Sequence, residues 1–370
     1  MKRLIGFVKT NIVMLIALTL AAVTMIIVPP DEEYLGYFDF KTLTCLFTVL
    51  AVVCALRNVR FFYTVAEKIV KRFGNARLAV IALVYITFIG SMLIANDMAL
   101  ITFLPLGYFV LISTHKEKYM CVTFILQNIA ANLGGMLTPF GNPQNLYLYS
   151  KFNIPDGEFM LIMLPAFLLA IAMITVSAII FVKPEPLELS GAERKLPRVR
   201  VAIYLILFAF AILCVFRFIP YQLALIVIPV FILIMDRRAL LNVDYGLLLT
   251  FVFFFIFSGN MARIDLVRNL FSALLDKSTL VVSALSCQLI SNVPTAILLS
   301  QFTENYKELL LGVNIGGCGT IISSLASLIT FRSYTEHNHG KAKHYLLVFS
   351  AFNFTFLAVL LVFQLLILAL

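Results

Sequence analysis

Long apolar runs separated by short polar segments make up most of the chain. Nine of them are predicted to form membrane-crossing helices, at 11–28, 42–56, 119–148, 159–182, 201–219, 221–235, 247–262, 309–331 and 345–370. A helix needs ~20 apolar residues to cross a hydrocarbon core ~30 Å thick. The pattern therefore predicts an all-α polytopic membrane protein with about nine membrane-crossing helices.

Two further apolar runs, at 78–112 and 279–303, are each interrupted near the middle by a polar tip. The tips read Ala95-Asn96-Asp97 and Ser291-Asn292-Val293-Pro294. We expect each run to form a re-entrant hairpin that returns to the side from which it came. The arms that we expect at 99–112 and 280–290 would reach only ~21 Å and ~16 Å as helices, too short to cross. Residues 78–94 are long enough to span the membrane. The run 78–112 is therefore compatible with either a re-entrant hairpin or two complete spans.

The basic residues predict the orientation of the chain. With the N-terminus in the cytoplasm and the C-terminus outside, 21 of the 28 Lys and Arg residues fall in predicted cytoplasmic segments. Cytoplasmic loops of membrane proteins retain basic residues, so this orientation satisfies the rule and the reverse would violate it. We therefore expect a multi-pass protein of the cell membrane, in contact with the lipid bilayer.

The two halves of the chain present the same parts in the same order. Residues 38–60 resemble 243–265, and NIAANLGGMLTPFGN (128–142) resembles NIGGCGTIISSLASL (314–328). The connectors at 60–73 and 264–277 have the spacing of amphipathic helices along the membrane interface. We expect a first repeat at 1–182, which contains the N-terminal helix, the cytoplasmic-facing hairpin 78–112 and the broken helix 119–148. A cytoplasmic linker and a connecting helix follow at 183–219. The second, inverted repeat at 220–370 contains the outward-facing hairpin 279–303 and the broken helix 309–331. Inverted repeats with paired interrupted segments are typical of secondary transporters, whose sites lie near the midplane.

The segment GGMLTPFGNPQN (134–145) cannot form a continuous helix. Pro139 and Pro143 remove two backbone donors, and its glycines permit unusual backbone angles. Its counterpart around Ser323, Ser324, Ala326 and Ser327 is richer in hydroxyl groups and lacks proline. Unwinding in such a segment frees carbonyls that can bind a cation and turns a half-helix N-terminus, which favours an anion, toward the site.

Asp97 is the one carboxylate that the pattern places deep in the apolar core. A charged side chain there costs at least ~2.5–3.5 kcal/mol on insertion scales, so a functional role is the default interpretation. Burial favours the protonated carboxyl, which makes Asp97 a candidate proton carrier or cation ligand. The alternative is a helix N-cap, and Ser291 and Asn292 have the same alternative.

Composition narrows the functional classes. Apolar residues make up 62% of the chain and charged residues 13%, which excludes an ordinary soluble enzyme. The net charge of +9 reports orientation rather than nucleic-acid binding, and the six cysteines fall in apolar runs as small hydrophobic fillers. No HExxH, GxSG or P-loop pattern occurs, so we expect no enzyme, no metal site beyond a sodium site, and no cofactor except sodium ions or protons as coupling ions.

The tips and the broken segments resemble those of the ion transporter superfamily that holds divalent anion:sodium symporters, citrate permeases, arsenite permeases and one type of sodium/proton antiporter. Both tip asparagines match, and Gly134-Gly135 through Thr138, Gly141, Pro143 and Asn145 look like the family's broken helix. The resemblance implies elevator-type alternating access and a homodimer. It implies one cation site at Asn96 and Gly141, a second at Asn292 and Ala326, and a substrate between the tips. The residues that we expect to bind substrate are Asn96, Thr138, Asn142, Asn145, Ser291, Asn292 and Ser327, and those expected to couple a cation or proton are Asn96, Asp97, Gly141, Asn292 and Ala326.

The tip sequences differ from the Ser-Asn-Thr of the divalent-anion branch, and an Asn-Asp tip is more like the arsenite and sodium/proton branches. The leading hypothesis is a secondary active transporter of a small anion, such as citrate or a dicarboxylate, coupled to sodium or protons. The alternative on the same fold is a sodium/proton antiporter or an arsenite-type metalloid exporter. A passive channel and a membrane-embedded enzyme are weaker alternatives, because inverted hairpins suit transport and no second catalytic group accompanies Asp97.

Overall fold

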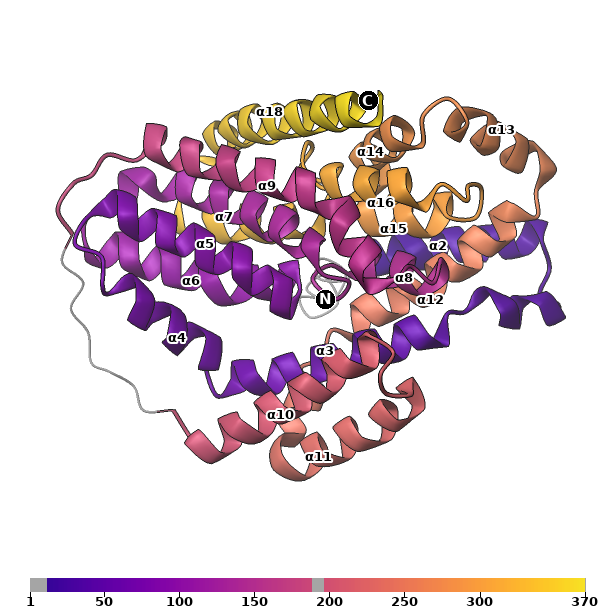
Figure 1. The fold of residues 1–370 in the computed structure, drawn as a ribbon, viewed down its shortest axis with the longest axis horizontal. Helices are drawn as coiled ribbons and strands as arrows, with labels where there is room; N and C mark the ends of the chain where they lie inside the picture. Colours follow the sequence, from indigo (N-terminus) through magenta and orange to yellow (C-terminus); the bar gives the residue numbers. More distant parts are fainter. Residues whose placement is uncertain (1–11, 188–195, 370) are drawn as a thin grey trace.

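The computed structural model describes residues 12–187 and 196–369, which form helices joined by short loops (Figure 1). One isolated β-bridge joins Asn75 and Pro186. The α-helices are α2 (Ile12–Ile27), α3 (Phe40–Asn58), α4 (Phe61–Val70), α5 (Ala76–Ile94), α6 (Asn96–Ser113), α7 (Met120–Gly134), α8 (Pro143–Lys151), α9 (Asp156–Phe181), α10 (Arg198–Val215), α11 (Tyr221–Leu241), α12 (Tyr245–Ala262), α13 (Asp265–Leu275), α14 (Thr279–Ile290), α15 (Asn292–Leu299), α16 (Tyr306–Ile315), α17 (Leu325–His337) and α18 (Ala342–Ala369). Short 3₁₀ helices are η1 (Glu32–Tyr37), η2 (Glu117–Tyr119) and η3 (Gly135–Leu137).

The all-α polytopic membrane fold is confirmed. In the described part of the chain, 8 helical segments are long and apolar enough to cross a membrane, or 9 if α13 and α14, which bend by 119°, count as one. The set includes both α5 and α6. Helix α6 begins at Asn96 and has 18 residues, so it reaches ~27 Å and is longer than the expected arm at 99–112. Helix α11 runs past the predicted 221–235 to Leu241, with a kink at Asp236 (φ −156°, ψ 74°).

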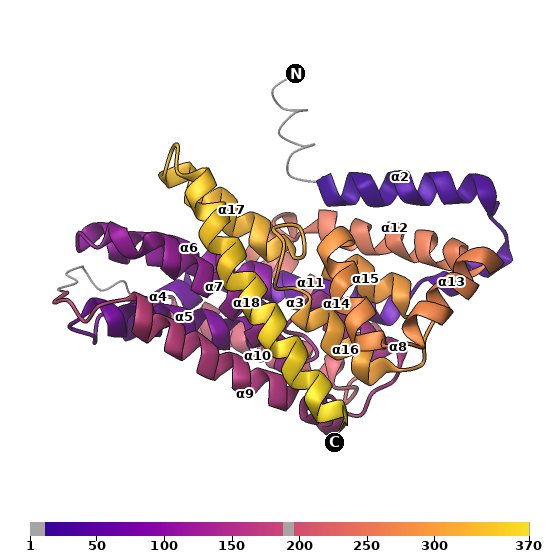
Figure 2. The same ribbon diagram turned by 90° about the horizontal axis from the view of Figure 1, so that it is seen from above.

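The helices form two groups. We call α2, α3, α10, α11 and α12 the frame, because α3 packs on α10 and α11 while α12 packs on α2. We call α5 to α9 and α14 to α18 the core (Figures 1 and 2). Helices α4 and α13 connect the two groups, since α4 contacts α3, α5 and α6, and α13 contacts α12 and α14. They occupy the positions of the two predicted amphipathic connectors.

Within the core, the second half of each broken helix packs against helices of the other repeat. Helix α17 of the second repeat packs on α6 and α7 of the first, and α8 of the first packs on α15 and α16 of the second. The second half of each broken helix therefore lies beside the hairpin of the other repeat.

Helix α9 shows how the sequence positions a core helix. Ala166, Ala170, Ile174 and Ala178 are buried and recur every four residues along one face. Small side chains on a buried face allow neighbouring helix backbones to approach closely in a membrane. Leu161 and Ile180, on the other side of α9, are exposed by 68% and 66%, which suits contact with lipid.

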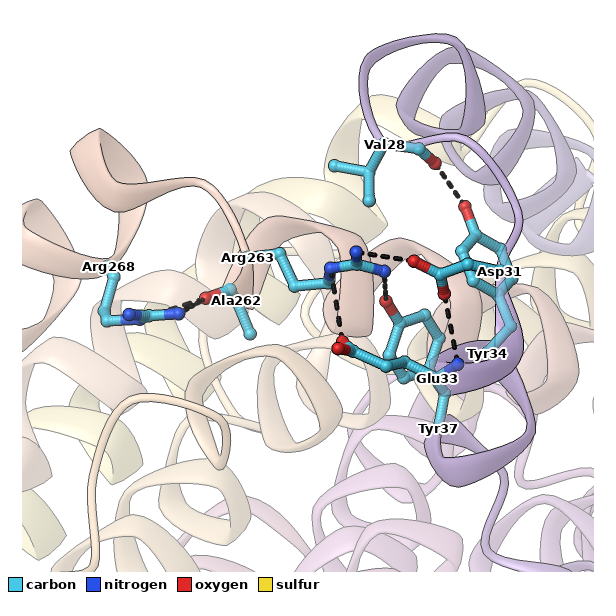
Figure 3. A network of polar contacts seen from close by, with 8 residues as sticks. All are labelled: Val28, Asp31, Glu33, Tyr34, Tyr37, Ala262, Arg263 and Arg268. Atoms are coloured by element: carbon cyan, nitrogen blue, oxygen red, sulfur yellow. Dashed lines mark hydrogen bonds and ion pairs between the residues drawn. The ribbon is translucent and has the colours of Figure 1, made fainter.

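Arg263 fastens the connection between α2 and α3 to the end of α12 (Figure 3). Its guanidinium bonds Asp31 at 2.6 Å and the Tyr37 hydroxyl at 3.1 Å, and it pairs with Glu33 at 3.4 Å. The hydrogen bond from Arg263 lowers the pKa of Asp31 below its usual range. The ring of Tyr37 lies against Gly259, where an added Cβ would come within 2.5 Å of it. The frame is therefore held together at this end by both charge and close packing.

The segment that follows α9 is tied to the open end of the first hairpin. The backbone of Glu185 accepts from Ala76 N at 2.8 Å, and Leu187 N donates to Gly74 O at 3.0 Å. The Glu185 carboxylate is bonded by Lys118, by Lys116 at 3.0 Å and by the Tyr119 hydroxyl at 2.8 Å. These donors, Lys118 first, hold the pKa of Glu185 at about 2, below its ordinary 4.5.

We predict that Glu185→Gln lowers the thermal unfolding midpoint in detergent at neutral pH by a few degrees at most, since these groups lie near the surface. A carboxylate whose pKa is depressed by folding stabilises the protein above its unfolded pKa, and this stability is lost as the pH falls through the folded pKa. The difference between wild type and Glu185→Gln should therefore shrink from about pH 4.5 toward pH 2. Exposed Glu117, which makes no ion pair among the described residues, supplies the control Glu117→Gln. A difference that stays constant with pH would contradict this account.

Candidate functional site

Both hairpin tips adopt the same unusual backbone conformation. Ala95 has φ 66° and ψ 150°, and Ser291 has φ 72° and ψ 160°. A non-glycine residue with positive φ is strained, and such residues persist where the surrounding contacts demand them. In each repeat the next residue, Asn96 or Asn292, begins the second hairpin helix.

Each tip is hydrogen-bonded to the broken helix of its own repeat. Asn96 N donates to Gly141 O at 3.1 Å, and Asn292 N donates to Ser323 O at 2.9 Å. Gly141 thus lies beside Asn96, as the family resemblance implies. In the second repeat Ser323 takes the equivalent place, while Ala326 lies three residues further on, in the first turn of α17.

The N-cap residues of α6 and α15 are Ala95 and Ser291, and neither makes a side-chain cap hydrogen bond. Each tip asparagine instead accepts a hydrogen bond from the next backbone N–H of its own helix. Asn96 Oδ1 accepts from Asp97 N at 2.9 Å, and Asn292 Oδ1 accepts from Val293 N at 2.9 Å. Ser291 Oγ donates to Ser323 O at 3.3 Å, so this predicted substrate residue also serves to dock the tip.

The two broken helices have the same arrangement, in which a non-helical segment separates two helices. In the first, η3 follows α7, residues 138–142 are non-helical, and α8 begins at Pro143, the helix position that tolerates a missing N–H. In the second, residues 316–324 separate α16 from α17, with Gly319 at φ +122°. Thr138 Oγ1 donates to Met92 O at 2.7 Å, and Thr320 Oγ1 donates to Gln288 O at 3.1 Å.

These contacts correct the register of the internal repeat. The sequence comparison set Asn128 against Asn314, but the matching hydrogen bonds set Asn132 against Asn314 and Thr138 against Thr320. The equivalent segments are then NLGGMLT (132–138) and NIGGCGT (314–320). The earlier alignment was displaced by four residues, about one helical turn, which preserves the helix face and so leaves the apolar pattern almost unchanged.

Buried side chains link the two breaks in reciprocal pairs. Ser324 Oγ donates to Asn132 Oδ1 at 2.8 Å, and Asn142 Nδ2 donates to Asn314 Oδ1 at 3.1 Å. Residues 132 and 314 are equivalent in the two repeats, and so are 142 and 324. All four side chains are at most 2% exposed. The break of each repeat is therefore held by the asparagine of the other.

Two more pairs extend the same layer. The Asn128 amide and the Ser327 hydroxyl bond each other at 3.1–3.2 Å. Asn314 Nδ2 donates to Asn145 Oδ1 at 2.6 Å, and Asn145 Nδ2 in turn donates to Gly135 O at 3.1 Å. The predicted residues Asn142, Asn145 and Ser327 thus lie together in one buried polar layer.

Asn128, Asn132, Gln144 and Asn314 were missed by the sequence analysis. The repeated pattern N-x-G-G-x-x-T would have singled out Asn132 and Asn314, because its two copies coincide in the correct register. Asn142 and Gln144 each keep a buried amide oxygen without a hydrogen-bond partner. Amide oxygens are ligands for hard cations and acceptors for hydroxyl groups, so these two suit either kind of occupant.

Asp97 is half-buried at the first tip, and its Oδ1 is buried without a hydrogen-bond partner. Within the described ranges it makes no ion pair closer than 4.0 Å. Next to it, Met98 Sδ lies 3.4 Å from a guanidinium nitrogen of Arg57. Asp97 therefore presents an acceptor that can take up a proton or a cation.

The second tip offers few donors to an anion. The amide hydrogens of Asn292 and Val293 are already bonded, and Thr295 N donates to Ser291 O at 3.2 Å. Pro294 has no N–H. The first turn of α15 is therefore saturated, although a free helix N-terminus would otherwise favour an anion.

The sequence profile of one known family, described as citrate transporter, matches residues 4–306. The chain belongs to this family. One relative, an uncharacterized transporter of Methanocaldococcus jannaschii, is 32% identical to this chain over 326 residues. The alignment covers 86% of this chain and 88% of the relative. Inner membrane protein YbiR of Escherichia coli is 25% identical over 303 residues, 80% of each chain. A silicon efflux transporter of Oryza sativa subsp. japonica is 30% identical over 153 residues, 40% of this chain and 31% of the relative. The family and these names indicate a multi-pass membrane transporter rather than an enzyme.

We predict that Gly135→Ala disrupts the first break. A Cβ at Gly135 would lie 2.3 Å from Asn142 Oδ1 and 2.7 Å from the backbone oxygen of Gly141. Overpacking of this kind destabilises by about 1–3 kcal/mol. Thermal unfolding in detergent should show the loss, whereas Gly157→Ala, which meets no atom within 4 Å, should not lower the midpoint. Equal midpoints for the two variants would contradict the tight approach of Gly135 to Asn142.

Proposed function

We propose that this protein is a secondary active transporter that moves a small oxyacid across the membrane in exchange for protons, with Asp97 as the proton carrier. The observation that carries this proposal is the placement of Asp97, whose unpartnered carboxylate oxygen lies at a strained hairpin tip docked on the broken helix. A titratable group at such a junction can bind a proton from one side of the membrane and release it to the other. An elevator-like movement of the core against the frame would carry the protonated group from the first side to the second.

An uncharged oxyacid suits the polar groups of the two breaks and an ionised Asp97 better than an anion does. The polar layer includes amide and hydroxyl groups of Asn128, Asn132, Asn142, Asn145, Asn314, Ser324 and Ser327, which donate and accept like the hydroxyls of silicic or arsenous acid. An ionised Asp97 ~5 Å from a monoanion would repel it by about 3 kcal/mol at an effective dielectric constant of ~20. The silicon efflux transporter among the relatives supports the same class of solute.

A carboxylate symporter is the second candidate, and the description of the family favours it. Here a proton or a sodium ion on Asp97 would remove the repulsion, so that the cation and the anion would bind together. The two candidates differ in the sign of coupling. An exchanged proton competes with the solute, whereas a cotransported cation promotes its binding.

We predict that Asp97→Asn removes the dependence of flux on the proton gradient. Purified protein in proteoliposomes is assayed with arsenite, silicic acid and citrate under pH gradients of both signs and with sodium gradients. Flux driven by the proton gradient should fall roughly tenfold or more in Asp97→Asn. This size is chosen because a typical coupling free energy of about 1–3 kcal/mol corresponds to a factor of roughly 5 to 150. Asp265→Asn, at an exposed carboxylate of α13, is the control and should keep the gradient dependence.

Three outcomes would decide against parts of this proposal. Wild-type flux that is indifferent to both gradients rejects coupling, and gradient dependence that survives in Asp97→Asn rejects Asp97 as the carrier. Citrate uptake driven by an inward proton or sodium gradient establishes the second candidate in place of the first.

A further inference from the structure

We propose that the pocket between the end of α8 and the connection from α2 to α3 binds the headgroup of an aminophospholipid. Its phosphate would lie on Lys151 of the core and its ammonium group on Asp39 of the frame, so that the lipid joins the two groups of helices. This inference goes beyond the proposed function and depends neither on Asp97 nor on the identity or coupling of the transported solute.

The pocket has a volume of about 370 Å³, and both groups of helices contribute to its walls. Its core wall consists of Tyr147, Ser150, Lys151 and Gln301. Its frame wall consists of residues 36–39, which precede α3, and of Phe255 and Gly259 of α12. Small-molecule sites have volumes of ~300–1,000 Å³, so the pocket is large enough for a headgroup.

The pocket is separate from the candidate functional site. Helix α8 begins at the first break with Pro143 and has 9 residues, so Lys151 lies ~12 Å along the helix axis from Pro143. Among the described residues, none that lines the pocket belongs to a hairpin tip or to the buried polar layer. A ligand of this pocket is therefore distinct from the transported solute.

Lys151 gives the core wall a positive charge. Its Nζ donates to Gln301 Oε1 at 3.3 Å, and it makes no ion pair within 4.0 Å in the described part of the chain. An ammonium group has three donors, so two remain for the oxygens of a phosphate. The hydroxyl of Ser150 belongs to the same wall and adds another donor.

Asp39 gives the frame wall a negative charge. Its carboxylate accepts from Thr42 N at 2.9 Å and from the Thr42 hydroxyl. A carboxylate has about four acceptor positions, so positions remain for a further donor. Within the described ranges Asp39 makes no ion pair closer than 4.0 Å.

The two opposite charges select the class of ligand. Lys151 and Asp39 line one pocket but do not pair with each other. A simple anion would be repelled by Asp39, and a simple cation would be repelled by Lys151. A zwitterion with a phosphate and a primary ammonium group satisfies both walls. A trimethylammonium group has no N–H and cannot donate to Asp39, so the pocket favours the primary amine.

Exposed apolar side chains favour a lipid over a soluble zwitterion. Leu35 and Phe40, on either side of residues 36–39, are 73% and 56% exposed, which suits contact with acyl chains. Tyr37 and Tyr147 line the pocket, and tyrosine is enriched where membrane proteins meet the headgroups. The headgroup can therefore enter the pocket while its acyl chains remain in the bilayer.

The frame wall is fixed by contacts of its own. The Tyr37 hydroxyl accepts from Arg263 at 3.1 Å (Figure 3), and the Tyr37 ring packs against Gly259. The core wall lies on α8, which begins at the first break, and beside α15, which begins at the second tip. A headgroup bound between the walls would therefore stabilise the present arrangement of core and frame.

The test compares lipids that differ only in the headgroup. Purified full-length protein in detergent, with copurified lipid removed, is titrated with phosphatidylethanolamine, phosphatidylcholine or phosphatidylglycerol of identical acyl chains. A separate titration uses phosphoethanolamine, which lacks the chains. The readout is the thermal unfolding midpoint, because a ligand that binds the native state raises it. We expect phosphatidylethanolamine to act at concentrations roughly tenfold lower than the other two lipids, and phosphoethanolamine to have a smaller effect.

We expect Lys151→Gln to weaken the apparent affinity for phosphatidylethanolamine roughly tenfold or more, because a charge-assisted hydrogen bond to the phosphate is lost. Asp39→Asn keeps a side-chain oxygen that suits the N-cap of α3, and it should abolish the preference for phosphatidylethanolamine over phosphatidylcholine. The controls Lys277→Gln and Asp265→Asn remove the same charges from exposed side chains outside the pocket and should keep both the affinity and the preference.

Equal midpoint shifts with phosphatidylethanolamine and phosphatidylcholine in the wild type overturn the recognition of the ammonium group by Asp39. An unchanged affinity in Lys151→Gln, or equal losses in Lys151→Gln and Lys277→Gln, overturn this pocket as the site. A phosphoethanolamine effect as large as that of the lipid identifies a soluble zwitterion as the occupant and overturns the lipid. Each of these outcomes leaves the proposed function standing, because none of the measurements involves transport.

Discussion

The structure depends on one constraint, which is that polar backbone groups inside a membrane must find hydrogen-bond partners within the protein. A hairpin tip exposes an N–H in the apolar interior, and a broken helix exposes a carbonyl. Here each satisfies the other, through Asn96 and Gly141 in the first repeat and through Asn292 and Ser323 in the second. A tip without its break would leave an unpaired donor, and a break without its tip would leave an unpaired acceptor. This explains why the two irregular features occur together in both repeats.

The polar layer between the breaks follows from the same constraint. Each break also exposes side chains that need partners, and the exchange of α8 and α17 between the repeats brings those partners together. In two of the pairs a long amide meets a short hydroxyl, Asn132 with Ser324 and Asn128 with Ser327. The repeats are therefore alike in backbone but different in side chains. That difference allows one tip to carry a titratable group while the other carries Val293 in its place.

The apolar pattern was sufficient to predict the helical membrane fold, because burial in lipid leaves a strong and simple signal. Polar residues inside an apolar run marked both tips, and Gly with Pro marked the first break. The sequence could not fix where α6 begins, since Asn96 and Asp97 look like loop residues and yet form its first turn. Nor could it fix the register of the repeat, because an error of four residues returns to the same helix face. The partners of Asn132 and Asn314 lie far along the chain, and only the packing of α8 and α17 across the repeats reveals them.

The distribution of directional contacts separates the core from the frame. Within the core, removing one partner from a buried hydrogen bond costs about 1–3 kcal/mol, so the two repeats resist separation. Core and frame meet at aromatic pairs, such as Tyr147 with Phe255 and Phe140 with Phe216, and such contacts tolerate sliding better. Two arginines of the frame also make directional contacts with the core: Arg217 donates to Tyr149 O at 2.8 Å and lies 4.1 Å from the centre of that ring, and Arg57 lies 3.4 Å from Met98 Sδ. A movement of the whole core against the frame therefore breaks fewer directional contacts than an opening within the core, but it must release Arg217 and Arg57.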